Sequence, residues 1–173
     1  EQDRLLRNEG DGDFLPIPLA LPELAGDGIG VACGDLDGDG DLDLYVANDG
    51  SANVLLRNNH SAGNHWLHVD LTGDTGNLDG IGAVVKVKAG GVTQTRQIAA
   101  GEGYLSQNAM LACFGLGSET TADWVYVLWP DGRESQRYAV AADQVLTILQ
   151  SDPSAVDPPV APTAETALGS AYP

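Results

Sequence analysis

Long hydrophobic runs and helical periodicity are both missing from this 173-residue sequence. No apolar run approaches the roughly 18 residues of a membrane-spanning helix, so we expect no membrane insertion. No window longer than a turn or two has the i, i+3, i+4, i+7 apolar spacing of an amphipathic helix. Instead, 22 glycines and 9 prolines accompany a hydrophobic content of 43%, which is typical of short strands joined by tight turns. The sequence therefore predicts an all-β fold.

Basic residues are also scarce. The chain has 8 lysines and arginines against 25 aspartates and glutamates, which gives a net charge of −17. A field of this sign repels nucleic acid and anionic membrane surfaces, so we expect neither as a partner. It attracts cations, and bound divalent ions would relieve the self-repulsion of the folded chain. The alternative is that the acidity only maintains solubility.

The chain has few cysteines. Cys33 and Cys113 lie 80 positions apart, a spacing that matches no zinc or redox motif. Each lies in an apolar, strand-like run, and two alternatives stay open: buried thiols, or a disulfide in an oxidising compartment. The chain begins with charged residues and without an initiating Met. We interpret it as a processed mature chain or a fragment.

Composition divides the chain into three predicted regions. Residues 1–62 are rich in Asp, Gly and Asn and carry a weak internal repeat, because DRLLRN at 3–8 is similar to NVLLRN at 53–58. Residues 63–150 have the pattern of a compact β domain. Residues 151–173 are rich in proline and hold no basic residue, which predicts an extended tail.

The middle region alternates apolar and polar residues with the period of two that β-strands have. Gly90-Gly91 and Asp131-Gly132 predict two hairpin turns within it. The expected strands cover 65–71, 83–89, 92–98, 109–114, 124–129, 135–140 and 144–150. About seven short strands separated by turn signals predict a β-sandwich.

The densest acidic run reads D-L-D-G-D-G-D-L-D. It places an aspartate at every second position: Asp35, Asp37, Asp39, Asp41 and Asp43. Gly38 and Gly40 tolerate positive φ, so the backbone can curl around a point instead of extending. Carboxylates at loop positions 1, 3, 5 and 9, with a carbonyl at position 7, form the all-oxygen shell that Ca²⁺ prefers. We therefore predict a structural calcium ion held by this run.

Other metal ions and other types of metal site fit the acidic run less well. No Cys or His joins it, so typical zinc ligation is not expected. Mg²⁺ needs a more rigid octahedron. An EF-hand needs a bidentate Glu at position 12, which here is Val46. The remaining alternative is a solvated acidic turn that binds no metal.

Two further groups of residues leave alternatives open. Asp74, Asn77 and Asp79 form either a second, weaker cation site or a polar turn. Trp124, Tyr126 and Trp129 form either a sugar-stacking platform or part of the core.

Several motifs resemble known families. GDLDGDGDLDLYVAND, followed by NVLLRNN, resembles one FG-GAP/VCBS repeat, whose calcium loop lies between strands of a β-propeller blade. The next region is similar to the ASPIC/UnbV domain. The motifs that carry this similarity are NHWL at 64–67, DGIGA at 79–83, GEGYLSQN at 101–108, FGLG at 114–117 and WPDG at 129–132. The resemblance implies a short propeller-blade-like calcium repeat region plus a β-sandwich, an extracellular setting and an interaction role.

Catalytic signatures are missing from the sequence. No G-x-S-x-G elbow occurs, and neither cysteine has a neighbouring histidine. His65 and His68 flank Trp66 at a spacing that places them on opposite faces of a strand, and His60 lies apart. Carboxylates that bind calcium are not available to titrate near neutral pH. We therefore predict that the protein is not an enzyme.

We predict a secreted or cell-surface, calcium-stabilised structural or adhesive protein that self-associates or binds extracellular partners. One repeat and a fraction are too little to close a propeller, and a lone blade leaves strand edges unpaired. Residues 4–7 are a candidate strand for addition to a neighbouring copy, which would build a homo-oligomer or filament. The alternatives are a carbohydrate-binding module, with glycans as partners, and a C-terminal fragment of a larger propeller protein.

Overall fold

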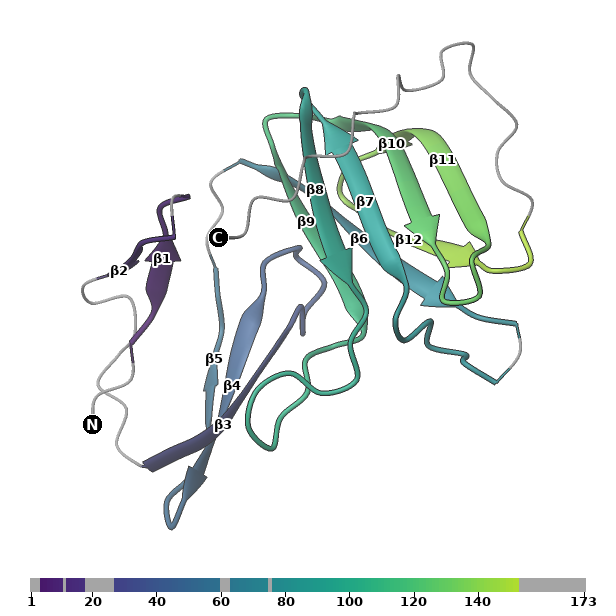
Figure 1. Cartoon of the computed structure of the whole chain (residues 1–173). Helices are drawn as coiled ribbons and strands as arrows, with labels where there is room; N and C mark the ends of the chain where they lie inside the picture. Colours follow the sequence, from purple (N-terminus) through teal and green to yellow (C-terminus); the bar gives the residue numbers. More distant parts are fainter. Residues whose placement is uncertain (1–3, 11, 18–26, 60–62, 75, 153–173) are drawn as a thin grey trace. The chain divides into compact units, whose positions relative to one another are not determined.

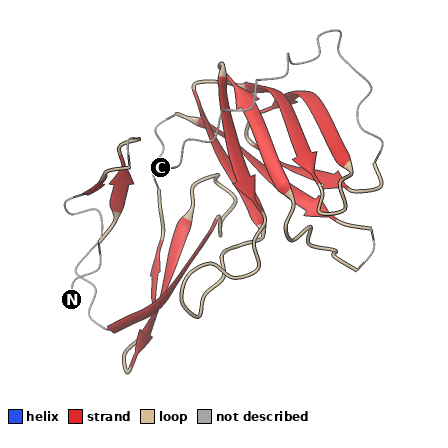
Figure 2. Cartoon of the chain, viewed as in Figure 1, coloured by secondary structure: helices blue, strands red, loops and turns tan. Residues whose placement is uncertain are grey.

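The computed structural model describes residues 4–10, 12–17, 27–59, 63–74 and 76–152. This described part contains twelve strands and no helix (Figure 1, Figure 2). The all-β prediction is therefore confirmed. It follows that the described residues contain no helix with the length and hydrophobicity needed to cross a bilayer.

The chain divides into two compact units. The first comprises Glu1–Asn64 and Ala99–Leu111, and the second comprises His65–Ile98 and Ala112–Pro173. The chain first passes from one unit to the other between Asn64 and His65, close to the boundary that composition predicts between residues 62 and 63. Composition alone, however, places 99–111 with the sandwich region. The predicted tail lies outside the described residues from position 153 onward.

A three-stranded antiparallel sheet forms the main part of the first unit. Its order is β3 (Asp27–Gly34), β4 (Asp43–Asp49) and β5 (Val54–Leu56). β3 and β4 pair from Asp27↔Asp49 to Gly34↔Asp43. The loop 35–42 therefore closes this hairpin, and Asp43 begins β4.

Two shorter strands form a separate antiparallel sheet. β1 (Leu6–Asn8) pairs with β2 (Phe14–Pro16), with Leu6 opposite Pro16. The Ile17 N–H also donates to the Leu5 carbonyl oxygen at 2.9 Å. One edge of the N-terminal strand is therefore already paired within the chain.

The segment Ala99–Leu111 lies along β3, an edge strand of the first unit. The Cys33 N–H donates to Asn108 Oδ1 at 2.9 Å, and the Ala109 N–H donates to the Cys33 carbonyl oxygen at 3.2 Å. Burial raises the pKa of the Cys33 thiol, and the charge of Glu102 raises it further. No disulfide joins Cys33 and Cys113 in this structure, and both side chains are half-buried rather than buried.

Seven strands form the second unit as far as the structure describes it. One sheet has the order β11-β10-β7-β8, and the other has the order β12-β6-β9. The strands are β6 (His65–Thr72), β7 (Val84–Ala89), β8 (Val92–Gln97), β9 (Leu111–Gly117), β10 (Thr121–Leu128), β11 (Glu134–Ala141) and β12 (Gln144–Leu149). Each expected strand has its counterpart here. The two-residue turn after Ala89 and the turn between Leu128 and Glu134 are the two predicted hairpins.

The two sheets of the second unit share one apolar core. Buried apolar residues recur at every second position: Leu67, Val69 and Leu71 in β6, Val85 and Val87 in β7, and Val125 and Val127 in β10. β6 and β12 pass behind the four-stranded sheet (Figure 1). Trp129 is 2% exposed and donates its indole N–H to the buried Ser135 Oγ at 2.9 Å. A buried indole N–H needs such a partner, and this bond fixes the end of the β10–β11 hairpin.

Asp143 sets the register of the parallel pair β6 and β12. Its backbone N–H donates to the Trp66 carbonyl oxygen at 2.7 Å, and its Oδ1 accepts from the Trp66 N–H at 3.2 Å. His65 Nδ1 donates to its Oδ2 at 2.7 Å. This bond to His65 lowers the pKa of the Asp143 carboxyl, and the Trp66 N–H lowers it further. The charged carboxylate therefore stabilises the fold where β12 begins.

We expect Asp143→Asn to lower the melting temperature at pH 7. Asparagine tolerates the positive φ of 59° at this position but removes the charge. A carboxyl whose pKa is lower in the folded state stabilises the fold above its unfolded pKa of about 3.9. That contribution is lost as the pH falls through the folded pKa. The difference between variant and parent should therefore be present at pH 7 and shrink in acid.

Calorimetric scans across the acid range measure this difference. Asp123→Asn, at an exposed position on β10, is the control and should leave the melting temperature unchanged. A difference for Asp143→Asn that stays constant down to strongly acidic pH would contradict an electrostatic origin.

Candidate metal centre

The loop 35–42 reverses the chain between β3 and β4. Gly38 and Gly40 have φ of 78° and 93°, values that glycine adopts without steric cost. Asp35 accepts hydrogen bonds from both of their N–H groups, through Oδ1 at 2.8 Å and through Oδ2 at 3.0 Å. Asp39 Oδ1 accepts from the Asp41 N–H at 3.0 Å. The loop therefore positions its carboxylates with its own backbone donors.

Three of the predicted ligands come together in this loop. Carboxylate oxygens of Asp35, Asp37 and Asp39 all lie within 4.8 Å of one another. Ca²⁺ binds oxygens at about 2.3–2.6 Å, so ligands on opposite sides of one ion lie up to about 5 Å apart. One ion can therefore contact all three carboxylates. The donor set, which contains only oxygen, fits calcium.

The other two predicted ligands lie outside this cluster. Asp43 is 2% exposed, and its carboxylate accepts from the Leu36 N–H at 3.1 Å and from the Asn58 N–H at 2.8 Å. Asp41 is half-buried, and its predicted contribution is a main-chain carbonyl rather than its side chain. The ligand set of five residues therefore stays a prediction, with three members assembled around one point.

Two residues that the acidic run does not indicate also belong to this region. Arg57 forms an ion pair with Asp37, and Asn58 supplies one of the two N–H groups to Asp43. Both lie just after β5, in the second copy of the LLRN repeat. The repeat was the available signal, but it does not show that this copy returns to the acidic loop.

Comparison with known families matches both parts of the chain. Residues 1–46 match the family model of the FG-GAP-like repeat, and residues 73–155 match that of ASPIC and UnbV. The chain is an FG-GAP-like repeat followed by an ASPIC and UnbV domain. The match to the repeat contains the whole acidic run and ends within β4. FG-GAP-like repeats commonly bind calcium, in agreement with the carboxylate cluster.

The chain is also similar to cartilage acidic protein 1 from several vertebrates. The mouse and human proteins are each 34% identical to it over 152 residues, which is 86% of this chain. The Xenopus tropicalis protein is 33% identical over 136 residues. The chain spans about a fifth of the length of these curated relatives (22%, 22% and 21%). The two domains and these relatives fit an extracellular protein.

The second polar run, in the ASPIC and UnbV domain, is occupied by protein contacts. Arg133 donates to both carboxylate oxygens of Asp74, at 2.7 and 2.9 Å. Asn77 exchanges two hydrogen bonds with the Ile81 backbone, at 2.8 and 2.9 Å. These bonds are those of a polar turn. Of the two alternatives for this run, a second cation site and a polar turn, they support the polar turn.

One of the three aromatic residues that could form a sugar-stacking platform is buried, and the other two are half-buried. Trp129 belongs to the core, while Trp124 and Tyr126 are half-buried on β10. Burial and the neighbouring Glu134 raise the pKa of Tyr126 to about 12. The enclosure counts against a sugar-stacking platform built from these three side chains.

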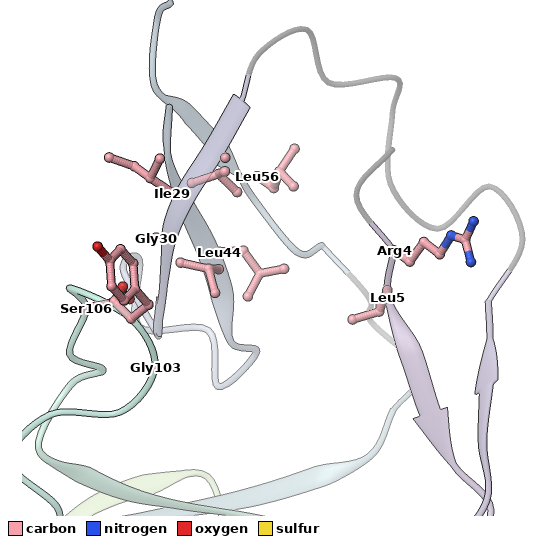
Figure 3. Close-up of a pocket in the computed structure, with 12 residues that line it drawn as sticks. Arg4, Leu5, Ile29, Gly30, Leu44, Leu56, Gly103 and Ser106 are labelled. Carbon is pink, nitrogen blue, oxygen red and sulfur yellow. The ribbon is translucent and has the colours of Figure 1, made fainter. Parts of the chain in front are cut away.

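An apolar groove of about 480 Å³ lies in the first unit (Figure 3). Its lining includes Leu5, Ile29, Val31, Leu44, Leu56 and Tyr104. Arg4 is the one charged residue among the described residues that line it, and they include no His, Asp or Glu. The groove and the carboxylate cluster are therefore chemically different features of the first unit.

We expect Asp43→Asn to destabilise the FG-GAP-like repeat even when no metal is present. An asparagine has one oxygen, so one of the two N–H groups would face an amide NH₂ in a buried site. Leaving a buried donor unsatisfied costs about 1–3 kcal/mol. Urea unfolding in the presence of a chelator measures this loss. Asp41→Asn is the control, and equal midpoints for the two variants would contradict the role given to Asp43.

Proposed function

We propose that this protein is a calcium-stabilised extracellular module with a structural or adhesive role, secreted or displayed at the cell surface. The observation that carries the proposal is the convergence of three carboxylates in the hairpin loop of an FG-GAP-like repeat. Asp35, Asp37 and Asp39 would hold the ion, which would supply the positive charge that this loop lacks. Its role is to hold the β3–β4 hairpin closed.

The charge of the chain supports a bound cation. The loop concentrates five aspartates in nine residues, and Arg57 is the cation paired with them, through Asp37. Like charges this close repel strongly where solvent is partly excluded. A divalent ion removes this repulsion within the loop and part of the repulsion within a chain of net charge −17.

A role without catalysis is part of the proposal. His65 binds Asp143 at the start of β12, and His68 is 1% exposed in the core of the second unit. His60 lies outside the described residues. The groove in the first unit has a mostly apolar lining. The two described histidines therefore have structural positions, and the groove lining offers few groups for acid–base chemistry. Both observations support a role in binding or structure.

Calcium should raise the melting temperature of the protein. A ligand at about 100 times its dissociation constant adds about 2.7 kcal/mol. For a chain of this size that corresponds to about 5–10 °C. Scans with calcium chloride and with excess chelator measure the shift. Asp37→Ala and Asp39→Ala should abolish it.

The matched control is Asp49→Ala. Asp49 is exposed and lies at the opposite end of β4, about 20 Å along the strand from the loop. This variant should keep the full shift. An unsubstituted protein that melts at the same temperature in calcium and in chelator would overturn the calcium proposal.

We also propose that the protein self-associates through the β1–β2 hairpin. This hairpin forms a two-stranded sheet of its own, and Leu6, Phe14 and Leu15 are all at least half exposed on it. Two strands alone are marginally stable in water, and exposed apolar side chains favour burial against a partner. A strand of a second copy adding to β1 would extend this sheet.

Sedimentation velocity and negative-stain microscopy at micromolar concentration with calcium test this proposal. We expect dimers or longer assemblies, which Phe14→Asp should reduce to monomers. Leu78→Asp replaces a leucine of similar exposure, 62%, in the second unit and should leave assembly unchanged. A monodisperse monomer of the unsubstituted chain would contradict self-association.

A further inference from the structure

The segment 102–109 binds to β3 close to the candidate metal centre. It makes two hydrogen bonds to the backbone of Cys33, one through the Asn108 side chain and one through the Ala109 N–H. Cys33 lies two residues before Asp35, the first predicted ligand. The segment therefore holds the strand end from which the acidic loop begins.

Gly30 of β3 lies in close contact with this segment, and Gly34 lies at an ordinary contact distance from it. A Cβ built on Gly30 would lie 3.3 Å from Ser106 Oγ and 3.4 Å from the Tyr104 carbonyl oxygen. A Cβ on Gly34 would lie 3.4 Å from the Ala109 Cβ. Figure 3 shows Ser106 close to β3 near Gly30. The absence of a side chain at Gly30 leaves room there for the Ser106 hydroxyl and the Tyr104 carbonyl oxygen.

The segment has internal bonds that shape it for this contact. Asn108 Nδ2 donates to Glu102 Oε2 at 2.5 Å, while Oδ1 of the same amide accepts from Cys33. Ser106 Oγ donates to the Tyr104 carbonyl oxygen at 2.8 Å. Leu105, at the tip, has a φ of 50°, a strained value for leucine. The side-chain amide of Asn108 therefore bonds both to Glu102, within the segment, and to Cys33 of β3.

We propose that Asn108 is a positioning residue for the calcium site, and that binding of the segment 102–109 to β3 and binding of calcium to the acidic loop stabilise each other. This inference rests on the proposed calcium binding. Both events require the same ordered strand end, Cys33–Gly34, next to Asp35. When the segment already orders that end, calcium binding loses less conformational entropy. The coupling is reciprocal, so calcium must also strengthen the segment's contact with β3.

Calcium titration calorimetry of Asn108→Ala tests one direction of the coupling. Typical coupling energies correspond to a change in affinity of about fivefold or more, and we expect calcium to bind weaker by that factor. Amide hydrogen exchange at Cys33 and Ala109 tests the other direction. Both amides should exchange more slowly in the unsubstituted protein when calcium is added.

Asn53→Ala is the matched control. Asn53 Oδ1 accepts from the Asn48 N–H at 3.0 Å, a bond of the same kind at the opposite end of the same sheet. Its loss should lower stability without changing calcium affinity. Equal affinities for Asn108→Ala and Asn53→Ala would overturn the inference.

A charge-swapped pair separates positioning from general damage to the fold. Asn108→Asp keeps the acceptor for Cys33 but places its carboxylate against Glu102, so calcium binding should weaken. Adding Glu102→Gln restores a donor to that carboxylate and should restore the affinity. Failure of this rescue, with both variants folded, would contradict the role of Asn108.

The outcomes distinguish the coupling between the segment and the calcium site from calcium binding itself. If the unsubstituted protein binds no calcium, both fail. If it binds calcium but the exchange of the Cys33 amide does not change, only the coupling fails. If it binds calcium and Asn108→Ala binds it equally well, the coupling again fails alone.

Discussion

The buried carboxylate of Asp43 holds together the hairpin on which the candidate metal centre depends. Through two backbone N–H groups it connects the start of the acidic loop, at Leu36, with the chain beyond β5, at Asn58. Burying an ionised carboxylate is costly unless its oxygens accept hydrogen bonds, and here both do. Because the loop closes at the Gly34↔Asp43 pair, the positions of its clustered carboxylates depend on this connection.

The acidic run therefore contains carboxylates with different roles, although its sequence looks uniform. Asp35 and Asp39 accept bonds from the loop's own backbone and shape the turn. Asp37 points toward a cation, which in this structure is Arg57. Asp43 is enclosed and connects strands. Mutual repulsion among these groups favours an extended chain, and the backbone bonds and the cation oppose it.

The two hairpins of the second unit, β7–β8 and β10–β11, follow from local turn signals and were predictable, whereas the pairings of β7 with β10 and of β6 with β12 join strands far apart in the chain. Buried residues alternate clearly along β7 and β9, each of which has one buried face, and short turns fix the register within the β7–β8 and β10–β11 hairpins. The segment 102–109 has no such alternation. It contacts Cys33, 75 residues earlier in the chain at Asn108, so neither its apolar content nor its spacing indicates where it binds. The same holds for Arg57, which meets Asp37 only after β5 has paired with β4.

The all-β class, the strands and hairpins of the sandwich region, and the position of the acidic loop could be predicted from the sequence alone. These follow from periods of two residues, from turn-forming dipeptides and from carboxylate spacing, all of which are local properties of the chain. Three further points are visible only in the folded chain: three of the five aspartates converge, Asp43 is enclosed, and 99–111 belongs to the first unit. Burial and long-range hydrogen bonds decided these points, because they depend on residues that meet only when the chain has folded.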